Sequence, residues 1–344
     1  MRISTLALCG VLTWGQLSAC AAEPPANVSI GQANVTPRNL NDFYELRRKK
    51  APAEIAAIQA EASARARKEA GVSSEGVVPS CVLPTWFLFE NPAFTLLRTS
   101  ASETEWLAHT TEIAAAIEKR NDTFARLKVG EDIDPAYSAT VGAFRRAMAA
   151  NTERARVYAM RAGEDQFHRS NSVIVQNGLI WAKNLRAESR GYLMEENVAQ
   201  VCQSDRSNTE WLRKDLAAYG WPRISSYGAA MDADAWLIIQ HSDHDAAFQT
   251  EVLKTLEPLL KTKDTSHQNY AFLYDRVAIA TKKRQRYGTQ GRCTGPGKWE
   301  PYPVEDESRL DALRAEIGLE PEAEYSKRFT FCTAELAAAM ASVK

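Results

Sequence analysis

Apolar residues recur at helical spacing along most of this chain, and the clearest stretch runs from residue 102 to residue 127. Ser102 and Glu105 stand three residues apart, in the order of a capping box that starts a helix. The apolar positions that follow share one helix face at near-heptad spacing: Trp106, Ile113, Ile117 and Phe124. The stretch therefore predicts an amphipathic helix.

The same periodicity predicts helices along the rest of the chain. Two helices are expected within residues 40–70, on either side of Pro52, and the others over 137–168, 173–201, 209–219, 229–241, 245–261, 268–281, 308–317 and 333–342. Residues 72–84 and 202–208 are predicted as loops, and residues 285–302 as a loop with one short extended piece. Residues 85–97 are aromatic and contain Pro92, so they fit a short strand or a buried segment equally well.

These elements predict a mostly α fold: an irregular multi-helix domain with long loops, preceded by a helical N-terminal region. We expect a boundary near residue 145, which gives an N-terminal region over 40–145, a domain over 146–326 and a tail helix within 327–344. The sequence shows no internal repeat, no glycine-rich phosphate loop, no G-x-S-x-G and no H-E-x-x-H motif. Those common enzyme classes are therefore not expected.

Residues 1–20 have the pattern of a secretory signal peptide. A positive start is followed by an apolar run over residues 3–19, which is short for a membrane span. Leu17–Cys20 fits a lipobox that would leave Cys20 as the lipidated first residue, whereas Ala19–Ala21 fits an ordinary cleavage site. Residues 21–39 are predicted as a flexible tether. We expect a periplasmic protein or an outer-membrane lipoprotein facing the periplasm, with secretion as the alternative.

Charge and cysteine content narrow the expected partners and the compartment. A formal net charge of -1 gives no reason to expect nucleic acid, so a membrane contact is expected only through a lipid on Cys20. Four cysteines remain in the mature chain, which predicts two disulfides in one of three pairings: Cys81, Cys202, Cys293 and Cys332. A metal site is the alternative for these thiols, but no C-x-x-C spacing supports it. The sequence therefore assigns no metal-ligating residue, and any cofactor is unknown.

The main candidate site lies where the predicted helix 229–241 ends. Gln240 and His241 come at the helix end, and Asp243 follows closely. A histidine beside carboxylates serves as a general base, as a metal ligand, or as a hydrogen-bonded structural group near a helix C-terminus. We treat His241 and Asp243, together with Asp275 from the next polar segment, as candidate catalytic residues and Gln240 as a candidate ligand-binding residue, with the structural role as the competing interpretation.

A second polar segment follows about thirty residues later. Asp275 and Arg276 lie on an apolar helix, and an inward-facing Asp275 would need a site residue or a structural arginine as its partner. The basic run 282–286 is either a solvated surface or part of an anion site, because a glycine lets backbone N–H groups turn toward a ligand. The candidate ligand-binding residues here are Arg276, Gln285, Tyr287, Gly288, Thr289 and Gln290.

Residues 151–326 resemble a bacterial domain family of unknown function, and five motifs in order carry the resemblance. The motifs are Asp165-Gln-Phe-His-Arg169, Gly220-Trp-Pro222, Gln240-His-Ser-Asp243, Asp275-Arg276 and Gln285-Arg-Tyr-Gly-Thr-Gln290. Residues 282–284 depart from the Gly-Lys-Pro expected before the last motif. The resemblance implies no reaction, but it adds Asp165 and Arg169 to the candidate ligand-binding residues.

The sequence leaves three kinds of function open. The first is a cell-envelope module that binds a small anionic ligand or an envelope protein through one polar site. The alternative is a hydrolase or transferase with His241 as its base and Asp243 or Asp275 as its orienter or a metal ligand, in which Arg276 and the Tyr287–Gln290 loop hold an anionic group. The third is a purely structural polar core. We predict that six residues from three segments converge in one pocket: His241, Asp243, Asp275, Arg276, Tyr287 and Gln290. Asp165 and Arg169, one helical turn apart, would pair with each other or add a wall.

Overall fold

The computed structural model describes residues 29–30, 33–34, 40–73, 80–334, 337, 338 and 340. The predicted signal peptide, with Cys20, lies outside the described residues, and so does most of the predicted tether. Within the described part the chain is mostly α-helical, with two small antiparallel ribbons. The mostly α fold is therefore confirmed. The proposed boundary near residue 145 stays a prediction.

Residues 40–219 form seven of the described α-helices. They are α1 (Leu40–Lys49), α2 (Pro52–Glu69), α3 (Thr85–Thr99), α4 (Glu103–Lys128), α5 (Ser138–Ala149), α6 (Glu153–Asn177) and α7 (Ala187–Tyr219). Short 3-10 turns precede α3 (Ser80–Val82), α5 (Pro135–Tyr137) and α7 (Ile180–Ala182). A ribbon of β1 (Ser29–Ile30) and β2 (Ala33–Asn34) precedes α1.

The second half contains shorter helices and a hairpin. Its elements are α8 (Ile224–Tyr227), α9 (Ala229–Gln240), α10 (Ala246–Thr262), α11 (His267–Ala280), β3 (Gly291–Gly295), β4 (Lys298–Pro301), a 3-10 turn (Glu307–Arg309), α12 (Leu310–Glu316) and α13 (Glu322–Ser326). Strand β3 pairs antiparallel with β4, with Cys293 opposite Trp299. Residues 334, 337, 338 and 340 of the predicted tail helix are helical, and the rest of that helix lies outside the described residues.

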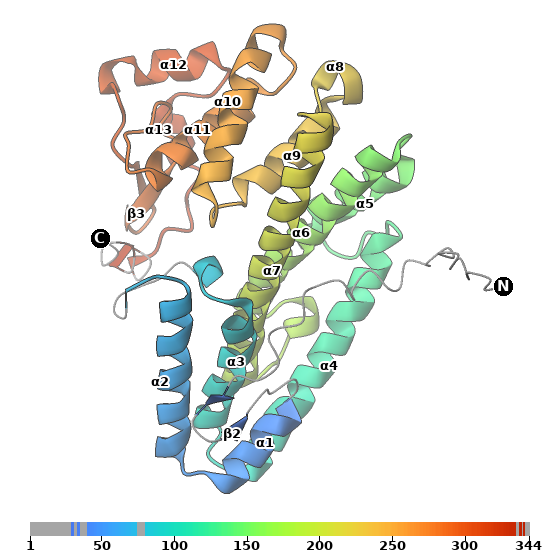
Figure 1. Cartoon of the computed structure of the whole chain (residues 1–344), viewed down its shortest axis with the longest axis vertical. Coiled ribbons are helices and arrows are strands. Elements are labelled where there is room, and N and C mark those ends of the chain that lie inside the picture. The colour runs from blue at the N-terminus through green and yellow to red at the C-terminus, as the bar shows by residue number, and fades with distance from the viewer. Residues whose placement is uncertain are drawn as a thin grey trace, which may run out of the picture.

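Helices α6 and α7 belong to two hydrophobic cores. In Figure 1, α7 runs through the middle of the molecule, with α1 to α4 at one end and α10 to α13 at the other. The first core contains Phe167 from α6 and Leu193 from α7, packed with residues of α1 to α5. The second contains Tyr158 from α6 and Leu212 from α7, packed with residues of α9 to α11. The two long helices therefore connect the two ends of the molecule.

The predicted helix over 102–127 is confirmed, since the Ser102 side chain accepts a hydrogen bond from the Glu105 backbone N–H at 3.2 Å. Residues 85–97 belong to helix α3, and Pro92 is tolerated inside that helix. The single helix predicted over 137–168 is in fact α5 and α6, because Thr152 caps a new helix start. The candidate loop 285–302 contains the β3–β4 hairpin.

The predicted loop over 202–208 is wrong, because α7 is continuous from Ala187 to Tyr219. The polar residues that suggested a loop form a buried face of this helix, and Asp205 and Asn208 both lie on it. Each has a partner on α6: Arg169 donates to Asp205 at 2.6 Å and Arg161 donates to Asn208 at 2.9 Å. The run of polar residues suggested a loop, but in the structure these side chains lie on a buried helix face and form hydrogen bonds with α6.

Both predicted disulfides are present. Cys81 pairs with Cys202, which ties the segment before α3 to the middle of α7, and Cys293 pairs with Cys332, which ties β3 to the segment after α13. Among the helices that the structure describes, none has the length and apolar character to cross a bilayer.

A glycine pair offers a direct test of how α5 packs on α6. A Cβ added at Gly163 would lie 2.6 Å from Phe144 Cε1, and Phe144 is fully buried, so Gly163→Ala should cost roughly 1–3 kcal/mol of unfolding free energy. A Cβ at Gly191 in α7 meets nothing within 4 Å, so Gly191→Ala should add up to about 1 kcal/mol. Urea unfolding of both variants measures the difference, and shifts of the same sign would contradict this packing.

Candidate functional site

The end of helix α9 is held in place by a buried side chain from α10. Gln249 is fully buried, and its side-chain nitrogen donates to the carbonyl oxygens of Ile239 at 3.1 Å and Gln240 at 3.2 Å. It also donates to Asp243 Oδ1 at 3.1 Å. Carbonyl groups at a helix C-terminus have no donor within the helix, and the Gln249 side chain provides that donor for two of them. The position of His241, the first residue after α9, is therefore fixed.

His241 meets three charged side chains of α6 and α7, and we call the four residues the His241 cluster. His241 Nδ1 lies 3.0 Å from Asp165 Oδ1. Arg169 Nε lies 3.1 Å from the same oxygen, while another nitrogen of this guanidinium lies 2.6 Å from Asp205 Oδ1. Asp165 and Asp205 are buried, and the Arg169 side chain is 31% exposed. Two buried carboxylates thus share one guanidinium.

The hydrogen-bond partners define the tautomer of His241. A carboxylate oxygen only accepts, so the ring hydrogen sits on Nδ1 and is donated to Asp165. The Nε2 atom lies 3.3 Å from the Gln240 side-chain nitrogen, which only donates, so Nε2 presents a lone pair. Burial lowers the pKa of His241 below its usual range, despite the opposing hydrogen bond to Asp165. The imidazole is therefore neutral at pH 7.

The two carboxylates of the cluster titrate differently. Burial raises the pKa of Asp165, but the His241 hydrogen bond and the Arg169 charge outweigh burial, so that pKa lies below its usual range. Burial raises the pKa of Asp205 to about 7, because Arg169 only partly offsets the burial and Asp165 adds a like charge. Asp205 therefore loses its proton close to neutral pH.

Asp205 and a neighbouring histidine should give the folded protein opposite pH dependences. The folded-state pKa of Asp205 lies above its usual value near 4, so its contribution to stability falls as the pH rises from about 4 to 7. Burial, aided by Arg120, lowers the pKa of His168 to about 4, so its contribution rises as the pH rises from about 4 to 6.5. The two effects partly cancel in the wild-type protein.

Single substitutions should expose these opposing effects. Between pH 5 and 6.5, the unfolding free energy of Asp205→Asn should increase more with pH than that of the wild type. For His168→Gln it should increase less, or decrease. Each change in slope is expected to reach up to about 1.4 kcal/mol per pH unit. Urea unfolding at several pH values measures both slopes, and parallel curves for the three proteins would refute the assignment.

An ion pair beside the cluster brings in helix α11. Arg276 donates to Asp243 Oδ2 at 2.7 Å, and the Asp243 side chain is 58% exposed. The Arg276 charge also contributes to the lowered pKa of His241. Arg276 therefore lies at the edge of the His241 cluster, within the solvent-facing part of the site.

Asp275, next to Arg276 in sequence, points away from the His241 cluster toward residues 286–289 and is fully buried. It accepts hydrogen bonds from the backbone N–H groups of Arg286 at 2.8 Å, Tyr287 at 3.0 Å and Thr289 at 2.8 Å, and from the Thr289 hydroxyl at 2.9 Å. Gly288 makes this tight loop feasible with a φ of 62°. Asp275 therefore holds the loop closed from inside.

Gln285 closes the same loop from its other side. Its side-chain nitrogen donates to the carbonyl oxygens of Gln290 at 2.8 Å and Tyr302 at 2.6 Å, and its side-chain oxygen accepts from the Gln290 N–H at 3.0 Å. The backbone N–H groups proposed for anion binding are thus used by Asp275 and Gln285. The sequence-based anion site in this loop gains no support from the geometry.

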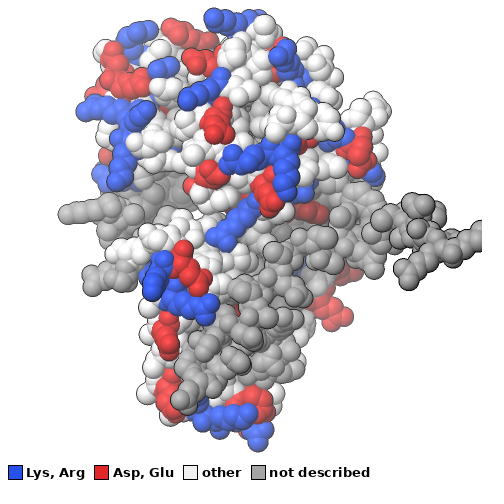
Figure 2. Space-filling model, viewed as in Figure 1, with Lys and Arg blue, Asp and Glu red and all other residues white. Residues whose placement is uncertain are grey.

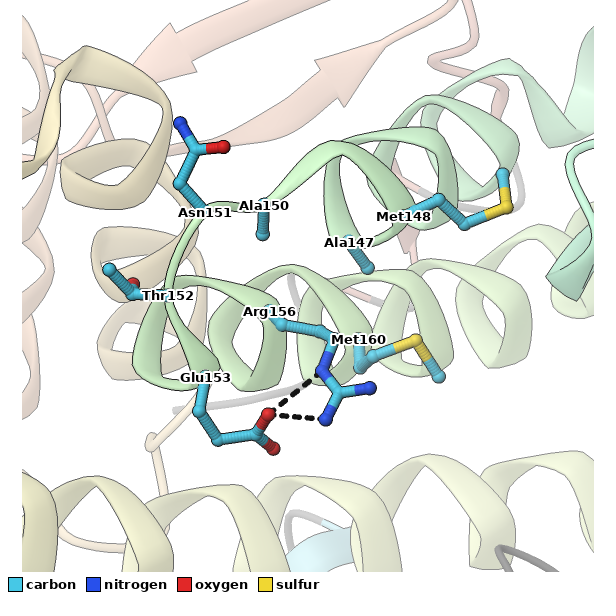
Figure 3. A pocket seen from close by; sticks show the side chains of 8 residues that line it. All are labelled: Ala147, Met148, Ala150, Asn151, Thr152, Glu153, Arg156 and Met160. Carbon is cyan, nitrogen blue, oxygen red and sulfur yellow. Dashed lines mark hydrogen bonds and ion pairs between the residues drawn. The ribbon is translucent and has the colours of Figure 1, made fainter.

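Two surface hollows lie apart from the cluster. Figure 3 shows the larger, of about 640 Å³, at the turn between α5 and α6, where Met160 lies beside the paired side chains of Glu153 and Arg156 on α6 and Met148 projects from α5. The second, of about 580 Å³, lies between α4 and the turn before α7 and includes Trp181. Neither hollow is lined by a residue of the His241 cluster.

Comparison with protein families gave one match. Residues 190–332 match the model of a family of unknown function, DUF6624. No curated protein and no solved structure matches the chain. The DUF6624 match supports the predicted domain of unknown function, and four of the five motifs lie within it. Asp165 and Arg169 precede the matched residues, so α6 supplies half of the cluster from outside the DUF6624 segment.

The structure divides the predicted site residues into two groups. Around the C-terminal end of α9 it brings together Asp165, Arg169, Gln240, His241, Asp243 and Arg276. The separate loop group contains Asp275, Gln285, Tyr287, Gly288, Thr289 and Gln290. The Asp243–Arg276 pair is the link between them, because Arg276 and Asp275 are adjacent on α11. Sequence analysis missed Asp205 and Gln249, since Asp205 lay in a predicted loop and Gln249 on a helix with no recognised motif.

Proposed function

We propose that this protein is an exported cell-envelope module that binds a small ligand at the His241 cluster. The observation that carries the proposal is the charge imbalance there: Asp165 and Asp205 are buried, and both depend on Arg169. Buried charges are costly without partners, and this cost raises the pKa of Asp205 to about 7. A cationic ligand that replaces the Asp205 proton would supply the missing partner.

Two features support an extracytoplasmic location. Both disulfides join segments that are distant in sequence, and disulfides of this kind persist in oxidising compartments. The signal-peptide pattern over residues 1–20 is independent support. Figure 2 shows basic and acidic side chains interspersed over the described surface of one face, which favours a small ligand or an envelope protein over nucleic acid as partner.

Binding is favoured over catalysis because the hydroxyl groups near the cluster are already used. Thr209 Oγ1 lies 2.7 Å from Ser242 Oγ and 2.7 Å from the Asp205 carbonyl oxygen, and both side chains are buried. Ser242 Oγ in turn donates to the Ile238 carbonyl. Neither hydroxyl is placed to act as a nucleophile on a bound substrate.

One observation favours a hydrolase or transferase as the second candidate. The Asp165 carboxylate accepts the Nδ1 hydrogen of His241 and leaves a lone pair on Nε2. A carboxylate-oriented imidazole of this kind is the usual form of a histidine general base. In this candidate the Gln240 amide moves away from Nε2, which then activates water, and Arg276 leaves Asp243 to hold an anionic substrate group.

Purification from a bacterial host with the natural N-terminus tests the proposal. Native mass spectrometry should show a mature chain that begins at a lipidated Cys20 or after Ala21, together with an additional bound mass that His241→Gln loses. Asp234→Asn is the matched control, because Asp234 is a buried carboxylate on α9 that pairs with Arg146, outside the cluster. A chain that still begins at Met1, or a spectrum unchanged by His241→Gln, would contradict the proposal.

The catalytic alternative has its own readout. Turnover of a p-nitrophenyl ester or phosphate by the wild-type protein, abolished by His241→Gln and kept by Asp234→Asn, would favour the enzyme over the binding module.

A further inference from the structure

We propose that Asp165, Asp205 and His241 bind a divalent transition-metal ion of the zinc type, and that this ion is the ligand, or part of it, in the binding site proposed above. The inference rests on that proposed function and makes the ligand class specific. The sequence alone assigned no metal-ligating residue.

The three side chains have the geometry of a metal site. Each offers one ligand atom, and the three atoms all lie within 4.8 Å of one another. The His241 nitrogen and the nearest Asp165 oxygen are 3.0 Å apart. Ligands bound about 2.0–2.2 Å from a tetrahedral zinc ion lie about 3.3 Å apart, so the three ligand side chains would only have to draw closer together once Arg169 has left the space between the carboxylates.

The ligand types select the class of metal. One imidazole nitrogen and two carboxylate oxygens suit zinc and related transition-metal ions, whereas calcium and magnesium prefer sites made of oxygen ligands alone. Thiolate competition is removed, because Cys81, Cys202, Cys293 and Cys332 are paired in disulfides. Gln166 donates to Asp165 Oδ2 at 2.8 Å and would keep this carboxylate oriented while its other oxygen binds the ion.

Arg169 takes the place of the ion in the metal-free protein. Its guanidinium bridges the two carboxylates, and its side chain is 31% exposed, so it can swing toward solvent when an ion arrives. A divalent ion neutralises both carboxylates, whereas the guanidinium carries a single charge. When His241 Nδ1 binds the ion, the ring hydrogen resides on Nε2, and a rotated Gln240 amide accepts it through its oxygen.

Because Arg169 would compete with the ion, the direction in which zinc affinity changes when Arg169 is replaced tests the proposal. If the guanidinium only stabilised the fold, its removal would leave metal binding unchanged or weaker. If it competes with the ion, Arg169→Gln should bind zinc more tightly than wild type, by about tenfold or more. Arg169→Lys keeps a charge in a smaller head group and serves where the glutamine variant does not fold.

Calorimetry on the untagged mature protein, with both disulfides intact and after dialysis against EDTA, tests the site. Zinc chloride should bind with a stoichiometry of one and raise the melting temperature, while calcium and magnesium chloride should do neither. Asp205→Asn and His241→Gln should each weaken zinc binding by about tenfold or more. The control variant Asp234→Asn should bind zinc like the wild type.

The outcomes separate this inference from the proposed function. Absence of one-to-one zinc binding, or binding unaffected by Asp205→Asn, overturns the metal site. If native mass spectrometry still shows a bound mass that depends on His241, the binding module stands with another ligand. If that mass is absent as well, both proposals fall.

Discussion

Replacing Asp275 with alanine should destabilise the protein by roughly 3–5 kcal/mol, although this residue lies outside the His241 cluster. The substitution removes the acceptor for the backbone N–H groups of Arg286, Tyr287 and Thr289, and for the Thr289 hydroxyl. A buried donor without an acceptor costs about 1–3 kcal/mol, and water entering the loop would recover part of the sum.

Urea unfolding measures this loss, and hydrogen exchange locates it. The amides of Arg286, Tyr287 and Thr289 should lose protection in Asp275→Ala. Asp306→Ala is the matched control, because Asp306 also accepts from a backbone N–H, that of Ser308 at 3.0 Å, but is exposed. Its replacement should cost about 1 kcal/mol or less. Equal losses in the two variants would show that burial of Asp275 does not determine its contribution.

Removing the Cys81–Cys202 disulfide should have an effect of similar size. The bond closes a segment of 121 residues, and a cross-link of that length stabilises by about 4–5 kcal/mol in the chain-entropy model. Cys293–Cys332 closes 39 residues and should contribute about 1 kcal/mol less. Paired alanine substitutions avoid a free thiol in each case.

Thermal and urea unfolding of the two double variants should rank them in that order. Reduction of the wild-type protein should reproduce the sum of their effects. A larger loss from the shorter cross-link would mean that native contacts at Cys293 and Cys332, which belong to a small core with Trp299 and Tyr325, outweigh chain entropy.

Helix periodicity predicted most of the fold because most helices have a clear apolar face. The stretch from Ser102 to Lys128 is the clearest example, since its cap and its apolar face indicate the same boundaries. Helix α7 was predicted as two pieces because its middle turns buried polar residues toward α6. Periodicity detects apolar burial, so a helix face that is buried through hydrogen bonds goes unrecognised.

The sequence identified most residues of the candidate site but not the groups to which they form hydrogen bonds. His241 was selected for its neighbouring carboxylates, yet its partner is Asp165, which is 76 residues away. An inward Asp275 was expected to need a side-chain partner, but its partners are mostly backbone N–H groups. Every residue except proline carries such a donor, so the sequence has no signal that distinguishes the donors that Asp275 would bind.

Because α6 and α7 belong to both hydrophobic cores, the two cores become available for folding in a fixed order during synthesis. All the buried residues of the first core precede residue 194, so they are synthesised before α9, α10 and α11. At that stage α6 can pack into the first core, while Tyr158 lacks the residues of α9 to α11 that cover it in the second core. The C-terminal helices thus add to a surface that is already formed. A nascent chain stopped soon after residue 193 should therefore display that apolar surface, where chaperones can bind it.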